Sequence, residues 1–264
     1  MVGDGAKPGT VVLDLDGVLY VDTEGVPGAG DALRALEDAG HRLVFATNNA
    51  TKDEETVVGH IAERTGFIAS PGSVATSGTA TARYLEGTVR RVLVLGEAAL
   101  AESLRRRGIA VVEEWRDAEA VVVGLDRGLT YARLTAATLA VGSGARFVAT
   151  SADSTYPTPE GLHPGGGAIA AAVAAATGVG PEVCGKPHEP MRALVRSLLG
   201  DGPVWVVGDR IETDLVMGTA EGWGTILVLS GVDSEADVAA AAVAPDLVVG
   251  SIADVPAALA AQPL

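Results

Sequence analysis

The chain has 264 residues, of which 48% are apolar and 20% charged, and its formal net charge is −15. These values exclude a disordered chain and indicate a globular protein with a sizeable core, in one large domain or two of medium size. The negative charge, with Arg105, Arg106 and Arg107 as the only basic run, argues against nucleic acid as a partner. The longest apolar stretches fall well short of the roughly 20 residues of a membrane span, so no membrane contact or export signal is expected. The single cysteine, Cys184, excludes an internal disulfide and favours a cytoplasmic protein.

Short Val-rich runs alternate along the chain with longer segments rich in Ala, Leu, Arg and Glu, a pattern typical of a parallel α/β fold. Strands are predicted at residues 10–14, 41–46, 91–95, 118–123, 146–149, 203–207, 225–229 and 246–249. Helices are predicted at residues 29–39, 53–65, 76–85, 98–107, 131–141, 168–176, 190–199, 211–221 and 234–241. The first ten residues are expected to form a loose tail, and residues 151–167 a long surface loop.

Two carboxylates stand close together where the first predicted strand ends, at Asp14 and Asp16. Where the chain turns out of a strand both side chains can face one small volume, and Gly17 lets the backbone approach a ligand. Two acids in one site require a cation, and carboxylate, carbonyl and water oxygens suit a hard ion such as Mg²⁺. A calcium loop or a solvated turn is the alternative interpretation of this segment.

The second predicted strand is followed by Thr47, Asn48 and Asn49, whose hydroxyl and amide groups can bind an anion without adding negative charge. The alternative is a helix cap, because Asn49 or Thr51 precedes two acidic residues. Lys186, in a Gly-Lys-Pro segment after an apolar stretch, is either a point charge that binds phosphate or a solvated surface lysine.

A further acid, Asp209, follows the strand predicted at residues 203–207, and Asp214 comes five residues later, in the first turn of a helix. Asp214 either belongs to a metal site or only interacts favourably with the helix dipole. All four groups follow predicted strands, and the carboxyl ends of parallel strands meet at one edge of a sheet. We therefore expect the four groups to converge on one crevice.

Taken in chain order, Asp-x-Asp-Gly, a Thr, a Lys and Gly-Asp-x-x-x-x-Asp resemble the motifs of the haloacid dehalogenase-like (HAD) superfamily. The interval between Asp14 and Thr47 leaves no room for an inserted lid, whereas that between Thr47 and Lys186 is long enough for a domain. The chain thus resembles subfamily IIA, which includes the NagD-like, 4-nitrophenyl phosphate, phosphoglycolate, glycerol-3-phosphate and pyridoxal-phosphate phosphatases. The resemblance implies a core with a doubly wound, Rossmann-like parallel sheet, residues 1–87 and 180–264, and an inserted type-IIA α/β cap, residues 88–179.

The resemblance also implies a Mg²⁺-dependent phosphatase that hydrolyses phosphomonoesters of small metabolites through an aspartyl-phosphate. Asp14 would be the nucleophile and Asp16 the general acid and base. Mg²⁺ would be bound by the Asp14 carboxylate, the Asp16 backbone carbonyl and Asp209, and by Asp214 through water. The phosphate would be bound by Gly17, Thr47, Asn48 and Lys186. The candidate substrates are glycerol 3-phosphate, phosphoglycolate, pyridoxal phosphate and nucleoside monophosphates, with 4-nitrophenyl phosphate as an artificial one.

The cap is expected to close over the crevice and to select the leaving group. Its candidates for substrate specificity are Ser151, Asp153 and His163, although His163 is alternatively an ordinary loop imidazole. Ser151 and Ala152 stand where the subfamily often has Asn and Pro, so the substrate itself is not identified. The alternatives for the whole chain are a phosphotransferase, a phosphatase of a larger partner such as a phosphoprotein, and a metal- or phosphometabolite-binding protein without turnover. Besides a small phosphorylated metabolite, the resemblance allows a homodimer formed through the cap.

Overall fold

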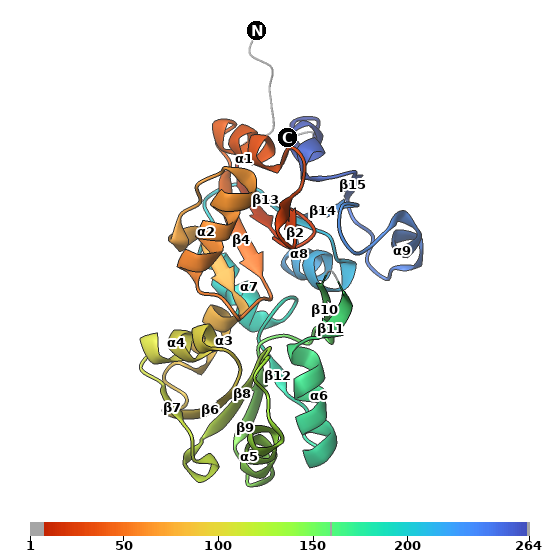
Figure 1. Cartoon of the computed structure of the whole chain (residues 1–264). Coiled ribbons are helices and arrows are strands. Elements are labelled where there is room, and N and C mark those ends of the chain that lie inside the picture. Colours follow the sequence, from red (N-terminus) through yellow and green to blue (C-terminus); the bar gives the residue numbers. More distant parts are fainter. Residues whose placement is uncertain (1–7, 159, 263–264) are drawn as a thin grey trace. The chain divides into compact units, whose positions relative to one another are not determined.

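The computed structural model describes residues 8–158 and 160–262, which form two compact units (Figure 1). The first unit comprises residues 1–46, 54–75 and 195–264, and the second comprises residues 47–53 and 76–194. The expected cap, residues 88–179, lies inside the second unit, which also includes chain on either side of it. Of the expected N-terminal tail, residues 1–7 lie outside the described residues, whereas Thr10 already begins the first strand.

A six-stranded sheet with the order β15-β14-β13-β1-β4-β5 forms the centre of the first unit (Figure 1). Its strands are β1 (Thr10–Leu13), β4 (Arg42–Thr47), β5 (Val74–Thr76), β13 (Val204–Gly208), β14 (Gly224–Val228) and β15 (Leu247–Val249). Strand β1 pairs in parallel with β13 on one side and β4 on the other, so that Val12 lies opposite Val206 and Val44. The chain order reverses between β1 and β13, which is where ligands bind in doubly wound sheets.

Strand β1 is apolar at every position but its first because helices cover both faces of the sheet, and all four of its residues are buried. The helices of this unit are α1 (Ala29–Asp38), α2 (Glu54–Thr65), α8 (Val216–Glu221), α9 (Glu235–Ala240) and α10 (Val255–Ala260). Leu33 and Leu36 of α1 and Ile61 of α2 pack with Phe45 of β4 in one apolar core. A short antiparallel ribbon, β2 (Tyr20–Val21) with β3 (Glu24–Gly25), follows the loop after β1.

The second unit has a five-stranded sheet with the order β12-β9-β8-β6-β7, and all four of its strand pairs are parallel. Its strands are β6 (Arg91–Leu95), β7 (Ala110–Val112), β8 (Ala120–Val123), β9 (Arg146–Ala149) and β12 (Glu182–Val183). Its helices are α3 (Ser77–Leu85), α4 (Ala98–Arg106), α5 (Tyr131–Gly142), α6 (Gly166–Thr177) and α7 (Glu189–Arg196), the last of which ends beyond the border at residue 194. Alternate residues of β8 enter separate cores, because Val122 packs with Leu100 of α4 whereas Val121 packs with Val173 of α6.

Residues 151–167, expected to form a surface loop, contain an antiparallel hairpin of β10 (Thr155–Thr158) and β11 (Gly161–Pro164). Tyr156 lies opposite His163, and the two rings are in edge contact with centroids 5.9 Å apart. The hydroxyl of Thr158 donates a hydrogen bond to the carbonyl of Gly161 across the turn, at 2.8 Å. The prediction of a loop was wrong because prolines are tolerated in a two-stranded ribbon, where much of the backbone needs no sheet partner.

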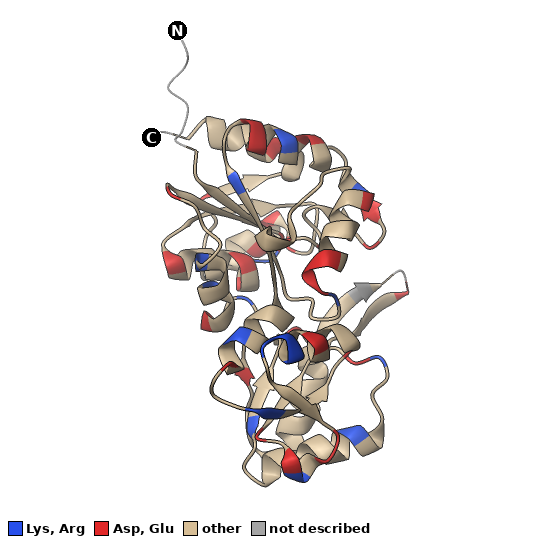
Figure 2. Ribbon diagram, turned by 90° about the vertical axis from the view of Figure 1, so that its left-hand side faces the viewer, with Lys and Arg blue, Asp and Glu red and all other residues tan. Residues whose placement is uncertain are grey.

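Acidic and basic residues are interspersed along the ribbon in both units rather than separated by sign (Figure 2). Many form exposed ion pairs, such as Arg107 with Glu86 at 2.9 Å. Among the described residues, none of the helices is long and apolar enough to span a bilayer.

Candidate active site

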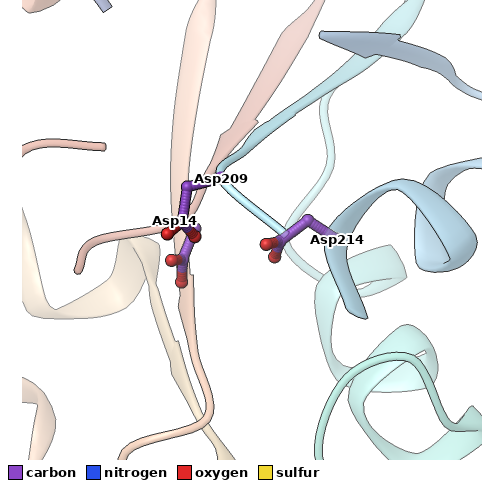
Figure 3. Close-up of side chains that lie close together, drawn as sticks. All are labelled: Asp14, Asp209 and Asp214. Atoms are coloured by element: carbon purple, nitrogen blue, oxygen red, sulfur yellow. The ribbon is translucent and has the colours of Figure 1, made fainter. Parts of the chain in front are cut away.

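Three aspartates come together at the point in the first unit where the strand order reverses (Figure 3). Asp14 follows β1, Asp209 follows β13, and Asp214 lies in the π-helical turn Ile211–Leu215 that leads into α8. Their carboxylate oxygens lie within 4.8 Å of one another, and the residues are only 9%, 2% and 1% exposed. The structure thus brings together the first and fourth predicted groups, which are about 200 residues apart in the chain.

The position of Asp209 depends on two glycines that surround its carboxylate. A Cβ atom on Gly17 would lie 2.3 Å from Oδ2 of Asp209, and one on Gly231 would lie 2.2 Å from the same atom. Gly17 also has a φ of +85°, a conformation that disfavours any other residue. The backbone amide of Val232 donates a hydrogen bond to this Oδ2 at 2.9 Å. The two close backbone segments leave the carboxylate little freedom to turn away.

Asp214 is fixed by its own helical turn. Its Oδ2 accepts hydrogen bonds from the backbone amide of Arg210 at 3.3 Å and from the hydroxyl of Thr213 at 3.4 Å. Gly208 makes room for it, since a Cβ there would lie 2.2 Å from the Cβ of Asp214. Figure 3 shows the Asp214 carboxylate directed toward the other two.

The aspartate cluster fits a hard divalent cation. Carboxylates buried this deeply repel one another unless a positive charge lies between them. Their donor atoms are all oxygen, the ligand type that Mg²⁺ and Ca²⁺ prefer. Asp14, Asp209 and Asp214 are therefore the residues that could bind such an ion.

Asp16 lies beside this cluster but differs from it in environment. It is exposed, whereas Leu15 before it and Gly17 after it are buried. The backbone of Asp16 forms an isolated β-bridge with that of Tyr20. Burial, together with the negative charges of Asp16 and Asp14, raises the pKa of the Tyr20 hydroxyl. The guanidinium of Arg64 lies 4.6 Å from the centre of the Tyr20 ring. An exposed carboxyl at the rim of a buried acidic cluster can exchange protons with a bound molecule or with water.

A second polar group lies in the second unit, around the side chain of Asn48. Its Oδ1 accepts a hydrogen bond from the backbone amide of Lys186 at 2.7 Å. Its Nδ2 donates to the Lys186 carbonyl at 3.3 Å and to Oδ2 of Asp153 at 3.1 Å. The Asn48 side chain thus clamps the backbone of Lys186, and this lysine is only 3% exposed. We call Asn48, Asp153 and Lys186 together the Asn48 clamp.

The clamp lies where strands β9 and β12 of the second sheet end. Cys184 continues the pairing, since its amide donates to the carbonyl of Ala149 at 2.9 Å. A Cβ on Gly185 would lie 2.5 Å from Oδ1 of Asn48 and 2.5 Å from the carbonyl oxygen of Thr150, so only glycine fits. Lys186 is therefore not a solvated surface lysine.

The remaining predicted site residues also belong to the second unit. Thr47 is buried, and its hydroxyl accepts a hydrogen bond from the Asn49 amide at 3.1 Å. Ser151 is buried in the segment before Asp153. His163 lies on the β10–β11 hairpin, where its Nε2 is 3.6 Å from Glu160. The bonds between Asn48 and Asp153 had no signal in the sequence, because nothing in the pattern pairs two residues so far apart.

Comparisons with known proteins identify the family of the chain. The profile of the haloacid dehalogenase-like hydrolases matches residues 11–110, and that of a HAD-hydrolase-like family matches residues 183–255. The acid sugar phosphatase of Staphylococcus aureus is 36% identical over 86% of this chain and 88% of its own. The chain belongs to the haloacid dehalogenase-like hydrolases.

Solved structures place it in subfamily IIA of that family. The 4-nitrophenylphosphatase of Thermotoga maritima is 31% identical, with a TM-score of 0.87 over 95% of this chain and 97% of its own. The glycerol phosphate phosphatase of Mycobacterium tuberculosis, solved in complex with magnesium, is 33% identical, with a TM-score of 0.87 over 97% of this chain and 79% of its own. These HAD relatives are phosphoric monoester hydrolases, and this chain is one too.

Proposed function

We propose that this HAD hydrolase is a Mg²⁺-dependent phosphatase of small phosphorylated metabolites that reacts through an aspartyl-phosphate on Asp14. The observation that supports it most strongly is the cluster of Asp14, Asp209 and Asp214, with the exposed Asp16 beside it. Sugar phosphates and glycerol phosphate are the first substrates to test, because relatives of the chain are named for them.

In the first step a carboxylate oxygen of Asp14 forms a bond to phosphorus, and the ester bond to the leaving oxygen breaks. The protonated carboxyl of Asp16 gives its proton to that oxygen, so the product leaves as an alcohol. Asp14 follows the central strand β1, whose buried pairing on both sides holds the nucleophile in a fixed direction.

In the second step the Asp16 carboxylate takes a proton from a water molecule as the water oxygen attacks phosphorus. The bond between phosphorus and the Asp14 oxygen breaks, inorganic phosphate forms, and Asp14 and Asp16 return to their initial states. Asp14, Asp209, the Asp16 carbonyl and, through water, Asp214 would hold Mg²⁺, which when bound would supply positive charge to offset the charge of the transferring group.

The phosphoryl oxygens need donors, and we assign them to Lys186, Thr47 and the backbone at Gly17 and Asn48. The bonds of the Asn48 side chain to Lys186 and Asp153 favour the backbone amide of Asn48, rather than its side chain, as the phosphate donor. The Asn48 clamp supports a role for Lys186, since a lysine with a fixed backbone is a well-positioned point charge.

The experiment that tests this function measures phosphate release from a panel of substrates with excess Mg²⁺ or with EDTA. The panel contains 4-nitrophenyl phosphate, glycerol 3-phosphate, glucose 6-phosphate, phosphoglycolate, pyridoxal phosphate and nucleoside monophosphates. We expect Mg²⁺-dependent turnover of several of them. Lack of turnover across the panel by protein that is folded would contradict the proposal and favour a binding role.

We further propose that the enzyme works in the cytoplasm and forms a homodimer through its cap. The single cysteine suits a reducing compartment, and the dimer rests on the subfamily resemblance. Light scattering coupled to size-exclusion chromatography tests the dimer, which a mass of one chain would contradict.

A further inference from the structure

The sheet of the second unit has a reversal of strand order of its own. After β6 the chain adds β7 on one side and then β8, β9 and β12 on the other, which gives the order β12-β9-β8-β6-β7. In open parallel sheets, ligands bind outside the carboxyl ends of the strands at such a reversal. In this unit the reversal lies between β6 and β8.

An ion pair connects the two loops at this point. Glu97 follows β6 and Arg127 follows β8, and Nε of Arg127 lies 2.7 Å from Oε1 of Glu97. Nη2 of Arg127 also donates a hydrogen bond to Oε2 of Glu97, at 3.3 Å. The side chains are 60% exposed for Arg127 and 27% exposed for Glu97, so both are partly accessible to a ligand.

An ion pair and hydrogen bonds of the neighbouring residues hold the loop that carries Arg127. The preceding residue, Asp126, has a side chain only 3% exposed that pairs with Arg133 at 2.5 Å. Its Oδ1 accepts a hydrogen bond from the amide of Gly128 at 3.0 Å, and Arg133 donates to the carbonyl of Val94 at 3.1 Å. Arg127 therefore projects from a fixed turn rather than from a loose loop.

The same edge of the sheet carries the Asn48 clamp, which includes Lys186. A Cβ on Gly124, at the end of β8, would lie 3.0 Å from the hydroxyl of Thr150, while the carbonyl of Thr150 is packed against Gly185. Strands β8 and β12 are two positions apart in the sheet, which places their ends about 10 Å from each other. That separation suits a molecule with a phosphate at one end and further polar groups at the other.

We propose that Glu97 and Arg127 bind hydroxyl groups of the leaving alcohol and select sugar and polyol phosphates over phosphorylated carboxylic acids. The pair is neutral as a whole and offers both acceptors and donors, which hydroxyl groups can match because each both donates and accepts. A carboxylate on the substrate would gain no net attraction from the pair, because Glu97 already neutralises the charge of Arg127. This assignment rests on the phosphatase function proposed above and adds its substrate class.

The test compares kcat/KM for glucose 6-phosphate, phosphoglycolate and 4-nitrophenyl phosphate, all with Mg²⁺, in the full-length protein. Arg127→Gln is expected to lower the ratio of glucose 6-phosphate to 4-nitrophenyl phosphate by about tenfold, the loss of one hydrogen bond to a charged group. Glu97→Gln leaves the guanidinium without its carboxylate and is expected to raise the ratio of phosphoglycolate to glucose 6-phosphate by about tenfold.

The matched control is Arg107→Gln, which removes another exposed ion pair of the same unit, at the end of α4 and away from the reversal. It should leave both ratios as in the wild type. Ratios in the Glu97 and Arg127 variants that match this control would overturn the inference, as would a wild type that hydrolyses 4-nitrophenyl phosphate but not glucose 6-phosphate. In both of these cases the phosphatase function would stand, whereas a wild type inactive on all substrates would overturn both proposals.

Discussion

Gly17 shows how a single position serves both backbone and site. Its φ is +85°, and a methyl group there would overlap the carboxylate of Asp209. The sequence could predict that Gly17 allows a close approach, because a glycine follows two acids at the end of a strand. It could not predict that the approaching group is Asp209, since that contact depends on the pairing of β1 with β13.

Gly17→Ala should lower the free energy of unfolding by about 1–3 kcal/mol and remove most of the phosphatase activity, because both the backbone and Asp209 must shift. Urea unfolding and 4-nitrophenyl phosphate turnover measure the two effects. The control is Gly66→Ala, at a φ of +69° with no atom within 4 Å of the added Cβ. This variant has the strain of a positive φ but no steric overlap, so it should lose stability and keep its activity. Equal activity in the two variants would show that the contact with Asp209 does not matter.

The site residues divide into those that local sequence could identify and those that it could not. Asp14, Asp209 and Asp214 follow strands that the apolar runs predict, so the sheet edge where they meet could be predicted as well. The Asn48 clamp could not, because the hydrogen bonds of an amide depend on which loops the tertiary fold brings beside it.

At the scale of elements, the strands and most of the long helices could be predicted to within about two residues, because their buried faces impose a period on the sequence. The helix predicted at residues 190–199 is an exception, since α7 ends at Arg196. The short strands β2, β3, β5, β7 and β12 were missed, since two or three residues show no period. The six-residue helix α10 was missed as well. The β10–β11 hairpin was missed because its prolines indicated a loop. These short elements depend on neighbouring strands or on each other for their formation.

The Asn48 clamp joins the loops after β4, β9 and β12, so its loss should affect all three. Asn48→Asp keeps the acceptor for the Lys186 amide but places a carboxylate against Asp153 and the Lys186 carbonyl. We expect a loss of about 1–3 kcal/mol in the free energy of unfolding and a higher KM for 4-nitrophenyl phosphate. Adding Asp153→Asn returns a donor to the pair and should restore part of both. A double variant no better than the single one would show that the two side chains do not act together.

Strands β9 and β12 are also joined by Arg146 and Glu182, at 2.8 Å. The hydrogen bonds from the Arg146 guanidinium lower the pKa of the Glu182 carboxyl from its usual 4.5. A carboxyl with a lowered folded-state pKa stabilises the fold above its unfolded-state pKa, and this contribution disappears as the pH falls through the folded-state value.

Glu182→Gln should therefore cost at most about 1 kcal/mol at neutral pH, since the pair is partly exposed. The difference from the wild type should shrink as the pH falls below 4.5. Urea unfolding of both proteins across the acid range measures it. A difference that stays constant with pH would mean that packing, and not charge, is what Glu182 contributes.

At the scale of the whole molecule, each unit has its own sheet and apolar cores, and the aspartate cluster belongs to the first unit. A cation that binds only the folded cluster must stabilise that unit, by about 2.7 kcal/mol when its concentration is 100 times Kd. Without a cation the three buried carboxylates repel one another.

Asp209→Asn should raise the melting temperature in the absence of Mg²⁺ and remove the gain in stability that Mg²⁺ gives. In EDTA the variant should melt above the wild type, because one of three close negative charges is gone. In excess Mg²⁺ the wild type should gain stability and the variant should not. Scanning calorimetry in the two buffers measures both midpoints, and an equal gain from Mg²⁺ in the two proteins would place the cation elsewhere.

The central claim is that Asp14 is the nucleophile of a Mg²⁺-dependent phosphatase, and the most direct test is 4-nitrophenyl phosphate hydrolysis by the wild type and Asp14→Asn. The amide has the shape of the carboxylate but is a poor nucleophile, so the variant should keep its circular dichroism spectrum and lose at least about 1,000-fold in kcat. The wild type should turn over only when Mg²⁺ is present. An Asp14→Asn protein with full Mg²⁺-dependent activity would contradict the account.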